Sequence, residues 1–218
     1  MTRKVSRAGA RWVDRIGLLL SREWRYDGIT VGVLEGQVKP PELVKRVTDA
    51  LSLLRKNDAR CYRRLKKDVS RIWVKVMAGT IGEYNEPLRT ICLDERFVAS
   101  PNTADSDIAA TIVHEATHAR LCAFGVVSND RTRARIEKMC FARELAFASR
   151  FQASNAFAEK IRLLEERPDT EWTHEKLRAL RLGAAPRALK YLGTPEFVTR
   201  FLVWCAALLT RLRRGRAA

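Results

Sequence analysis

"TIVHEATHAR", residues 111–120, places two histidines four residues apart, with a glutamate directly after the first. The stretch has the pattern of a helix, in which successive residues advance by about 100°. Relative to His114, His118 then lies at about 40° and Glu115 at about 100°, so the three side chains share one face. Two imidazoles one turn apart can bind one zinc ion, and an adjacent carboxylate can reach water on that ion. The chain has only three histidines, which favours this interpretation over an ordinary solvent-exposed helix face.

The helix predicted over residues 106–124 also has a side suited to packing. Small apolar residues occupy most positions away from the histidines: Ala109, Ile112, Val113, Ala116 and Ala119. Asp105 or Ser106 can cap the N-terminus, and Gly125 supplies a C-terminal stop. We therefore expect this helix to bury one side under a sheet and to present its other side to a metal site.

Two histidines form an incomplete site, because a catalytic zinc ion usually takes three protein ligands. The next helix, predicted over residues 131–152, supplies two candidates seven residues apart, Glu137 and Glu144. The connection is short, which favours antiparallel neighbours. At about 1.5 Å per residue, Glu137 comes level with the two histidines, whereas Glu144 lies beyond both. Glu137 is therefore the preferred third ligand, and Glu144 is the alternative.

With these residues, the sequence resembles the gluzincin branch of the zincin superfamily of zinc metallopeptidases. The motif HExxH is present as "HEATH", and 18 residues separate His118 from Glu137, similar to the spacing in that branch. The resemblance covers residues 70–165 at most. It departs from the extended motif at Arg120, where an apolar residue is preferred.

The resemblance implies a small β-sheet packed on the HExxH helix, followed by an antiparallel ligand helix. It also implies a hydrolase that binds Zn²⁺ through His114, His118 and Glu137. Glu115 would act as general base on a peptide or protein substrate. An edge strand, expected at residues 88–94, would line the cleft and pair with an extended peptide. Hydrolysis of a non-peptide amide is a further possibility.

Other polar groups are candidates for roles beside the motif. A further donor is expected to stabilise the developing oxyanion, with Tyr84, Tyr191 and His174 as candidates, although His174 is interpreted as a surface residue. Cys122 and Cys140 lie one turn past predicted site residues. We interpret them as buried thiols that pack like small apolar residues.

The rest of the chain predicts a mainly helical α+β protein. Strands are predicted at residues 71–77 and 88–94, with "AGTIGEYNEP" as a turn between them. Further helices are predicted at residues 5–24, 41–55, 59–68, 154–165, 171–183 and 195–213, and a loop with a short strand before residue 41. We expect a basic helical segment at 1–70, a zincin-like core at 71–165 and a basic helical segment at 166–218, forming one unit.

The net charge of +16 is unevenly distributed. Residues 1–75 hold 19 basic and 8 acidic residues, residues 76–152 hold 9 and 10, and residues 153–218 hold 13 and 7. The basic ends suggest an alternative function, a non-catalytic protein that binds nucleic acid or an anionic membrane surface and keeps a structural or vestigial zinc site. The 30 arginines against 11 lysines also fit the composition of a GC-rich bacterial genome.

Cysteines and apolar runs bear on the compartment. The five cysteines are scattered and odd in number, as in a reduced cytoplasmic protein. The longest apolar run, residues 201–209, is shorter than the roughly 20 residues that span a bilayer. The last helix could instead lie on the membrane surface through its aromatic residues and the arginines after them. We therefore predict a cytoplasmic protein, with a peripheral membrane position as an alternative.

Overall fold

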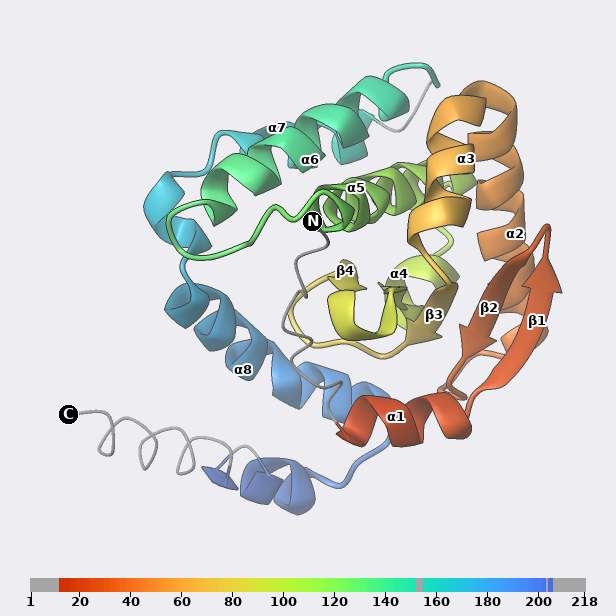
Figure 1. The fold of residues 1–218 in the computed structure, drawn as a ribbon. Coiled ribbons are helices and arrows are strands. Elements are labelled where there is room, and N and C mark those ends of the chain that lie inside the picture. The colour runs from red at the N-terminus through yellow and green to blue at the C-terminus, as the bar shows by residue number, and fades with distance from the viewer. Residues whose placement is uncertain (1–11, 152–154, 203, 206–218) are drawn as a thin grey trace.

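The computed structural model describes residues 12–151, 155–202 and 204–205, and the chain has a mixed α+β fold (Figure 1). The predicted α+β class, mainly helical, is confirmed. The helices in this part of the chain are α1 (Trp12–Leu19), α2 (Pro40–Asn57), α3 (Ala59–Asp68), α4 (Glu95–Ala99), α5 (Asp105–Ala123), α6 (Arg133–Ala148), α7 (Asn155–Glu165) and α8 (His174–Tyr191). The strands are β1 (Arg22–Tyr26), β2 (Ile29–Val33), β3 (Arg71–Lys75), β4 (Gly82–Asn85) and β5 (Thr90–Asp94), and two 3-10 turns are η1 (Glu86–Leu88) and η2 (Asp169–Trp172).

The strands of the described chain form one five-stranded sheet in the order β1-β2-β3-β5-β4. The inner pairs β2–β3 and β3–β5 are parallel, and the outer pairs β1–β2 and β4–β5 are antiparallel. Helices α2 and α3 make the crossover from β2 to β3. The short strand β4 is an edge of the sheet, and it lies beside α5.

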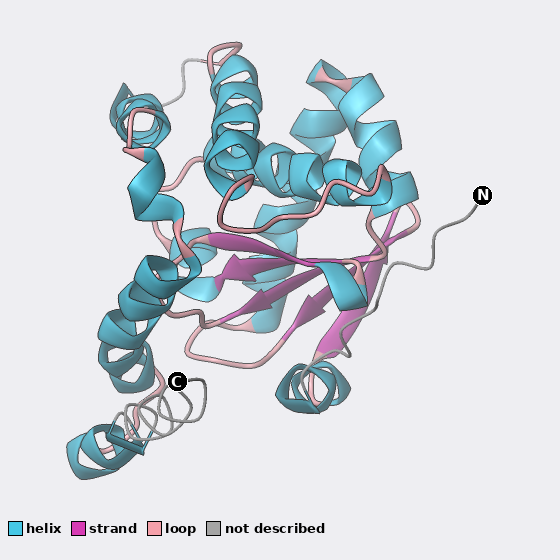
Figure 2. Cartoon of the chain, turned by 60° about the vertical axis from the view of Figure 1, so that its left-hand side comes forward, coloured by secondary structure: helices cyan, strands magenta, loops and turns pink. Residues whose placement is uncertain are grey.

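Alternation along the central strands gives the sheet two different faces. Ile72 and Val74 of β3 are fully buried in the main core with α2 and α5. Trp73, between them, points to the opposite face and joins a smaller cluster with Met77 and Cys92. Figure 2 shows most helices above the sheet and α1 below it. The alternation predicted for the strand at residues 71–77 is therefore confirmed, and the strand ends two residues earlier, at Lys75.

Helix α5 has well-defined ends. At its start, the backbone N–H of Ala104 donates to the carboxylate of Asp107 at 3.0 Å. At its end, Gly125 has φ 79° and donates to the carbonyl of Cys122, while Val126 donates to that of Leu121. These two bonds satisfy the last free carbonyls of the helix, and they need the left-handed conformation that glycine adopts without strain. The predicted stop at Gly125 is confirmed, whereas the predicted cap at Asp105 or Ser106 is wrong by one residue or two.

Two sequence predictions about the sheet are wrong. The stretch predicted as a turn contains the edge strand β4, and the strand predicted at residues 88–94 as the edge is observed at Thr90–Asp94 as the inner strand β5. Gly79 and Gly82 are typical of turns, so the local pattern did not indicate a strand here. The four-residue strand β4 forms through its pairing with β5, which the local pattern does not show. The short strand predicted before residue 41 is observed as β2, whereas the last residues of the helix predicted at 5–24 belong to β1. The segment 1–70 therefore contributes two strands to the same sheet as the core.

The other predicted helices match in kind and differ at their ends. Helix α8 continues to Tyr191, past the predicted end at residue 183, and includes Pro186. The predicted helix at residues 5–24 is observed only as α1, and residues 1–11 lie outside the described residues. Residues 196–202 are helical, while residues 206–218, which include the basic tail, lie outside the described residues.

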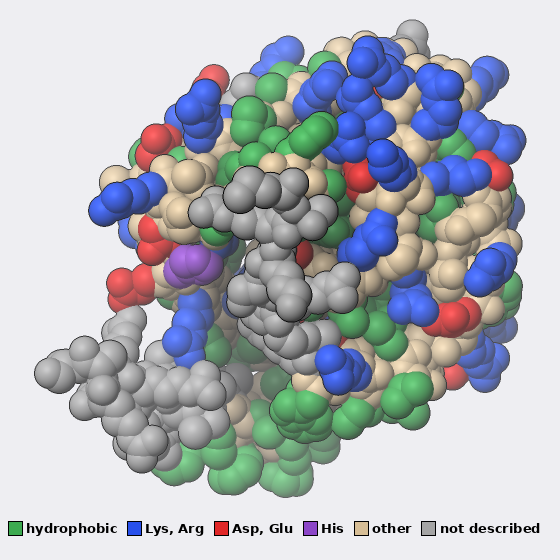
Figure 3. Space-filling view, viewed as in Figure 1, with side chains coloured by type: hydrophobic (Ala, Val, Ile, Leu, Met, Phe, Trp, Pro, Cys, Tyr) green, Lys and Arg blue, Asp and Glu red, His purple; other side chains and the backbone are tan. Residues whose placement is uncertain are grey.

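Charged and apolar side chains gather on different parts of the surface. Figure 3 shows lysine and arginine side chains over the upper right, where α3 lies, and hydrophobic side chains along the lower edge. The lower edge contains α1 and the helix at residues 196–202, whose exposed side chains include Trp12, Leu19, Phe197 and Phe201. Among the described residues, no helix combines the length and apolar character needed to cross a membrane.

Packing of α2 on the sheet gives a first testable prediction. Leu51 is fully buried in the core, whereas Leu53 on the same helix is only half-buried. We expect Leu51→Ala to lower the free energy of unfolding by about 2–5 kcal/mol, because it leaves a cavity. Leu53→Ala should cost clearly less. Urea unfolding followed by circular dichroism measures both, and equal losses would contradict the observed orientation of α2.

Candidate metal centre

Helices α5 and α6 run antiparallel, and this arrangement brings the predicted site residues together. Thr111 contacts Glu144, His114 contacts Phe141 and His118 contacts Glu137, so later residues of α5 meet earlier residues of α6. The antiparallel packing was expected from the short connection between the helices.

Three side-chain atoms converge on one point between these helices. The Nε2 atoms of His114 and His118 lie 3.2 Å apart. Oε2 of Glu137 lies 3.4 Å from each of them. Two imidazole nitrogens this close can share a proton in a hydrogen bond, and the same arrangement lets both bind a cation placed between them. The carboxylate of Glu137 adds the negative charge that such a cation requires.

The size of this triangle fits a zinc ion. Ligand bonds of about 2.0–2.2 Å in a tetrahedral site place neighbouring ligand atoms about 3.3–3.5 Å apart. Two of the observed edges, at 3.4 Å each, fall within this range, and the third, at 3.2 Å between the two Nε2 atoms, is slightly shorter. Two imidazole nitrogens and one carboxylate oxygen are also a donor set that zinc accepts in catalytic sites.

Glu144, the alternative ligand, lies on the other side of the first imidazole. Its Oε2 is 2.8 Å from Nδ1 of His114, and Thr111 Oγ1 donates to its Oε1 at 3.4 Å. A carboxylate at Nδ1 accepts the ring proton there and leaves Nε2 free to bind a metal. The structure therefore places Glu137 at the convergence point, and Glu144 in a position to orient His114.

Glu115 is buried beside the two histidines and against the edge strand. A Cβ atom added to Gly82 of β4 would lie 2.9 Å from Oε1 of Glu115 and 2.9 Å from Cγ2 of Thr111. Glycine at this position therefore lets the strand approach the carboxylate closely. Burial raises the pKa of Glu115, and the neighbouring His114 and His118 act against this rise.

Protonation in the cluster is strongly coupled. Burial lowers the pKa of His114, but hydrogen bonds to Glu137 and Glu144 outweigh burial and raise this pKa to about 10. Burial also raises the pKa of Glu137, but its bonds to the two imidazoles hold that pKa far below its usual range. The pocket therefore favours positive charge on the imidazole of His114 and negative charge on Glu137.

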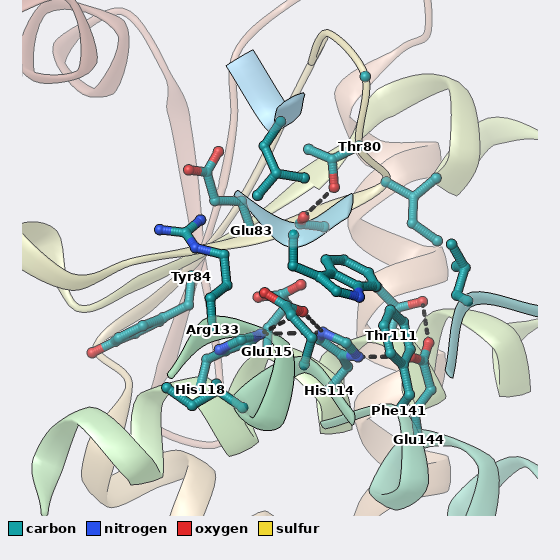
Figure 4. Close-up of a pocket in the computed structure, with 18 of the residues that line it drawn as sticks. Thr80, Glu83, Tyr84, Thr111, His114, Glu115, His118, Arg133, Phe141 and Glu144 are labelled. Carbon is teal, nitrogen blue, oxygen red and sulfur yellow. Dashed lines mark hydrogen bonds and ion pairs between the residues drawn. The ribbon is translucent and has the colours of Figure 1, made fainter. Parts of the chain in front are cut away.

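The cluster opens into a cavity of about 760 Å³ between β4, α5, α6 and α8 (Figure 4). Its lining includes Glu115, His114, His118 and Glu137 together with apolar residues of α7 and α8, such as Ile161 and Leu177. A cavity of this size accommodates several residues of an extended peptide or a molecule of similar size.

The three residues considered as the donor that would stabilise an oxyanion lie at different places in the structure. Tyr84 lines the cavity from β4, but its hydroxyl points away from Glu115 in Figure 4. The hydroxyl of Tyr191 donates to Glu95 at 3.0 Å, outside the cavity lining. His174 is exposed and hydrogen-bonds the guanidinium of Arg133.

The two cysteines differ in position. Cys140 is fully buried, and its Sγ and the ligand nitrogens of His114 and His118 all lie within 4.8 Å of one another, so it could also approach a metal. Burial strongly raises the pKa of this thiol, which opposes the thiolate form that metals bind. Cys122 lines the cavity wall, and burial with a hydrogen bond to Glu86 raises its pKa to about 11.

Sequence reasoning did not identify Gly82, Thr111 or Arg133 as parts of the site. Arg133 lines the cavity one helical turn before Glu137, and its Nε is buried without a hydrogen-bond partner in the described structure. Arg133 lies four residues before Glu137 on α6, so helical spacing could have predicted that the two side chains face the same site. Nothing local in the sequence predicts that β4 brings Gly82 to Glu115.

In comparisons with known proteins, no family model matches the chain, and no curated protein or solved structure matches it. The interpretation of the site therefore depends on its residues and geometry.

Zinc affinity tests the different roles assigned to Glu137 and Glu144. We expect purified wild-type protein to bind about one zinc ion per chain and Glu137→Gln to lose most of this affinity. Glu144→Gln should weaken zinc binding by about 10–100-fold, because it disturbs the orientation of His114. Competition titration with a chelating zinc indicator measures each affinity, with Cys140→Ser as a matched control that should retain zinc. Full binding by Glu137→Gln together with loss in Glu144→Gln would reverse the assignment.

Proposed function

We propose that this protein is a zinc-dependent hydrolase, and that it is a small metallopeptidase. The observation that carries the proposal is the triangle of two imidazole nitrogens and one carboxylate oxygen, with the further carboxylate of Glu115 beside it. Three protein ligands leave a fourth position of a tetrahedral ion for water or substrate. A purely structural zinc site has no need for a buried glutamate that is not a ligand.

The arrangement around the triangle supports the resemblance to gluzincins. A sheet lies on the HExxH helix α5, and α6 follows as an antiparallel helix that contributes Glu137. The zincin-like core that we propose therefore comprises β3, β4, β5, α5 and α6. Strands β1 and β2 extend its sheet on the side away from the cavity.

The residues of the chain can perform amide hydrolysis in a simple sequence. His114, His118 and Glu137 would hold Zn²⁺, which when bound lowers the pKa of water to about 7 and offsets charge on a carbonyl oxygen. Glu115, whose pKa is raised by burial, would accept the proton of the attacking water. It then donates that proton to the departing amine. Burial of the site excludes bulk water from competing for these proton transfers.

The free edge of β4 supports a peptide as substrate. Asp94 N–H donates to the carbonyl of Ile81 at 2.9 Å, which marks this pair as a hydrogen-bonded pair of the ladder. Such pairs alternate in an antiparallel ladder, so the backbone groups of Gly82 and Tyr84 point outward from the sheet. In the described chain β4 pairs only with β5. An extended peptide can add to this edge and pass over Glu115.

The alternative, a non-catalytic basic binding protein with a structural or vestigial zinc site, predicts different chemistry. It would need a fourth protein ligand, for which Cys140 is the nearest candidate, and it gives Glu115 no role. The cavity next to the triangle favours the enzyme. The free, scattered cysteines support our further proposal of a reducing, cytoplasmic location.

Glu115 tests the catalytic role directly. We expect Glu115→Gln to retain zinc and to lose hydrolysis of peptides by about 10²–10⁴-fold, because the proton acceptor is gone. Mass spectrometry of a peptide mixture, with zinc content measured in the same samples, detects both. Unchanged cleavage in the zinc-loaded variant would reject Glu115 as the base, and a wild-type protein that binds zinc but cleaves no amide would favour the alternative.

The contact between β4 and α5 gives a further prediction. In Gly82→Ala the new Cβ displaces the carboxylate of Glu115 or the methyl group of Thr111, so we expect kcat to fall by about tenfold or more while zinc affinity changes little. Gly183→Ala is the matched control, because a Cβ there meets no atom within 4 Å. Equal kcat values in the two variants would contradict this role of Gly82.

A further inference from the structure

Four basic residues form a stripe on the outer face of α3. Arg60, Arg63, Arg64 and Lys67 follow the spacing that keeps side chains on one side of a helix, within an arc of about 100°. The opposite side of α3 is buried through Tyr62 and Leu65. The α3 stripe, defined by these four residues, is about 10 Å long. Arg60, Arg63 and Lys67 are exposed, and Arg64 is partly exposed.

The acidic residues near the α3 stripe are already engaged. Asp27 pairs with Lys66 at 3.0 Å, and Asp58 caps α3 and pairs with Arg150 at 3.5 Å. Asp68 is buried and pairs with Arg120 at 3.2 Å. Among the described residues, no acidic side chain pairs with any member of the α3 stripe. The stripe is therefore a set of uncompensated positive charges.

Helix α6 extends the same basic surface. Arg150, just after the end of α6, donates to the carbonyl of Asn57 at 2.9 Å and pairs with Asp58 at 3.5 Å, beside the start of α3. Arg64, Arg143 and Arg150 each also lower the pKa of Cys61, against burial that raises it to about 11. Arg143 and Arg150 are exposed. The basic surface thus continues from α3 to Arg143 of α6 and to Arg150 just past its end, whereas the metal cavity does not include any of these residues.

The basic surface is distinct from the apolar surface. The exposed side of α3 presents no aromatic or large apolar side chain, and the exposed hydrophobic residues of α1 and residues 196–204 lie at the lower edge of Figure 3. A protein that lies on an anionic membrane combines basic and apolar side chains on one face. A protein that binds single-stranded nucleic acid offers aromatic side chains on which bases stack. Neither pattern occurs on this surface.

We propose that the α3 stripe, with Arg143 and Arg150, binds the phosphate backbone of double-stranded nucleic acid without sequence preference. Guanidinium groups bind phosphate oxygens in a bidentate manner, and duplex DNA presents a phosphate about every 3.4 Å along each strand, so a 10 Å stripe spans several phosphates. The stripe lies on the outside of a helix that is anchored in the core, so its charges are held in a fixed row. This activity is independent of the metal centre.

A charge-matched pair of variants tests the proposal. The stripe variant carries Arg60→Gln, Arg63→Gln and Lys67→Gln, and the control variant carries Arg135→Gln, Lys190→Gln and Arg200→Gln, all at exposed positions. Both variants lose three positive charges, so any effect of net charge is equal. Fluorescence anisotropy of a labelled random-sequence DNA duplex between about 50 and 200 mM salt gives the affinity and its salt dependence. Circular dichroism spectra check that both variants are folded.

We expect the stripe variant to bind roughly tenfold or more weakly at low salt, with the slope of log affinity against log salt reduced by about three, while the control stays near wild type. Glu115→Gln should bind the duplex as wild type does. Equal losses in both variants would overturn the proposal in favour of non-specific attraction to net charge. Absence of wild-type binding at low salt would also overturn it. So would binding to vesicles of anionic lipid that depends on the stripe when duplex binding does not.

Discussion

Two imidazole nitrogens 3.2 Å apart, with a carboxylate oxygen 3.4 Å from each, impose the main constraint on this structure. Such a group is unfavourable in a buried position unless a proton on an imidazole or a bound cation balances the carboxylates. Holding the three atoms there requires two helices at fixed depth and rotation relative to one another. The antiparallel packing of α5 on α6 provides this, and the apolar side of α5, buried under the sheet, fixes its rotation. Because the position of every ligand atom depends on that packing, the core supports the site directly.

The surroundings of the triangle assign different tasks to chemically similar groups. Three glutamates lie around His114, and each has a different position. Glu137 meets Nε2, Glu144 meets Nδ1, and Glu115 is buried beside β4. The first can bind a metal, the second can fix the orientation and tautomer of the ring, and the third can move a proton. Their roles follow from which atom of the imidazole, or which strand, each carboxylate faces.

Acidic, basic and exposed apolar side chains also occupy different regions of the protein. The acidic groups of the candidate metal centre are enclosed between α5 and α6, whereas the basic side chains without an acidic partner lie on the outside of α3. Exposed apolar side chains occupy a third region, on α1 and residues 196–204. This separation is compatible with the proposed metal site although the net charge is +16, since exposed charges act weakly through water over more than about 8–10 Å.

The sequence by itself determined the elements whose periodicity is strong and local. The extent of α5, its stop at Gly125, the alternation of β3 and the shared face of His114, Glu115 and His118 depend on helical or strand geometry within one segment. Depth along two antiparallel helices also placed Glu137 level with the histidines, because a short connection restricts how two helices can pack. Only the tertiary structure decided that β4 is the edge strand, that residues 22–33 belong to the sheet and that Glu144 faces Nδ1. These features depend on contacts between residues distant in sequence, where strand pairing and burial outweigh local turn signals such as Gly79 and Gly82.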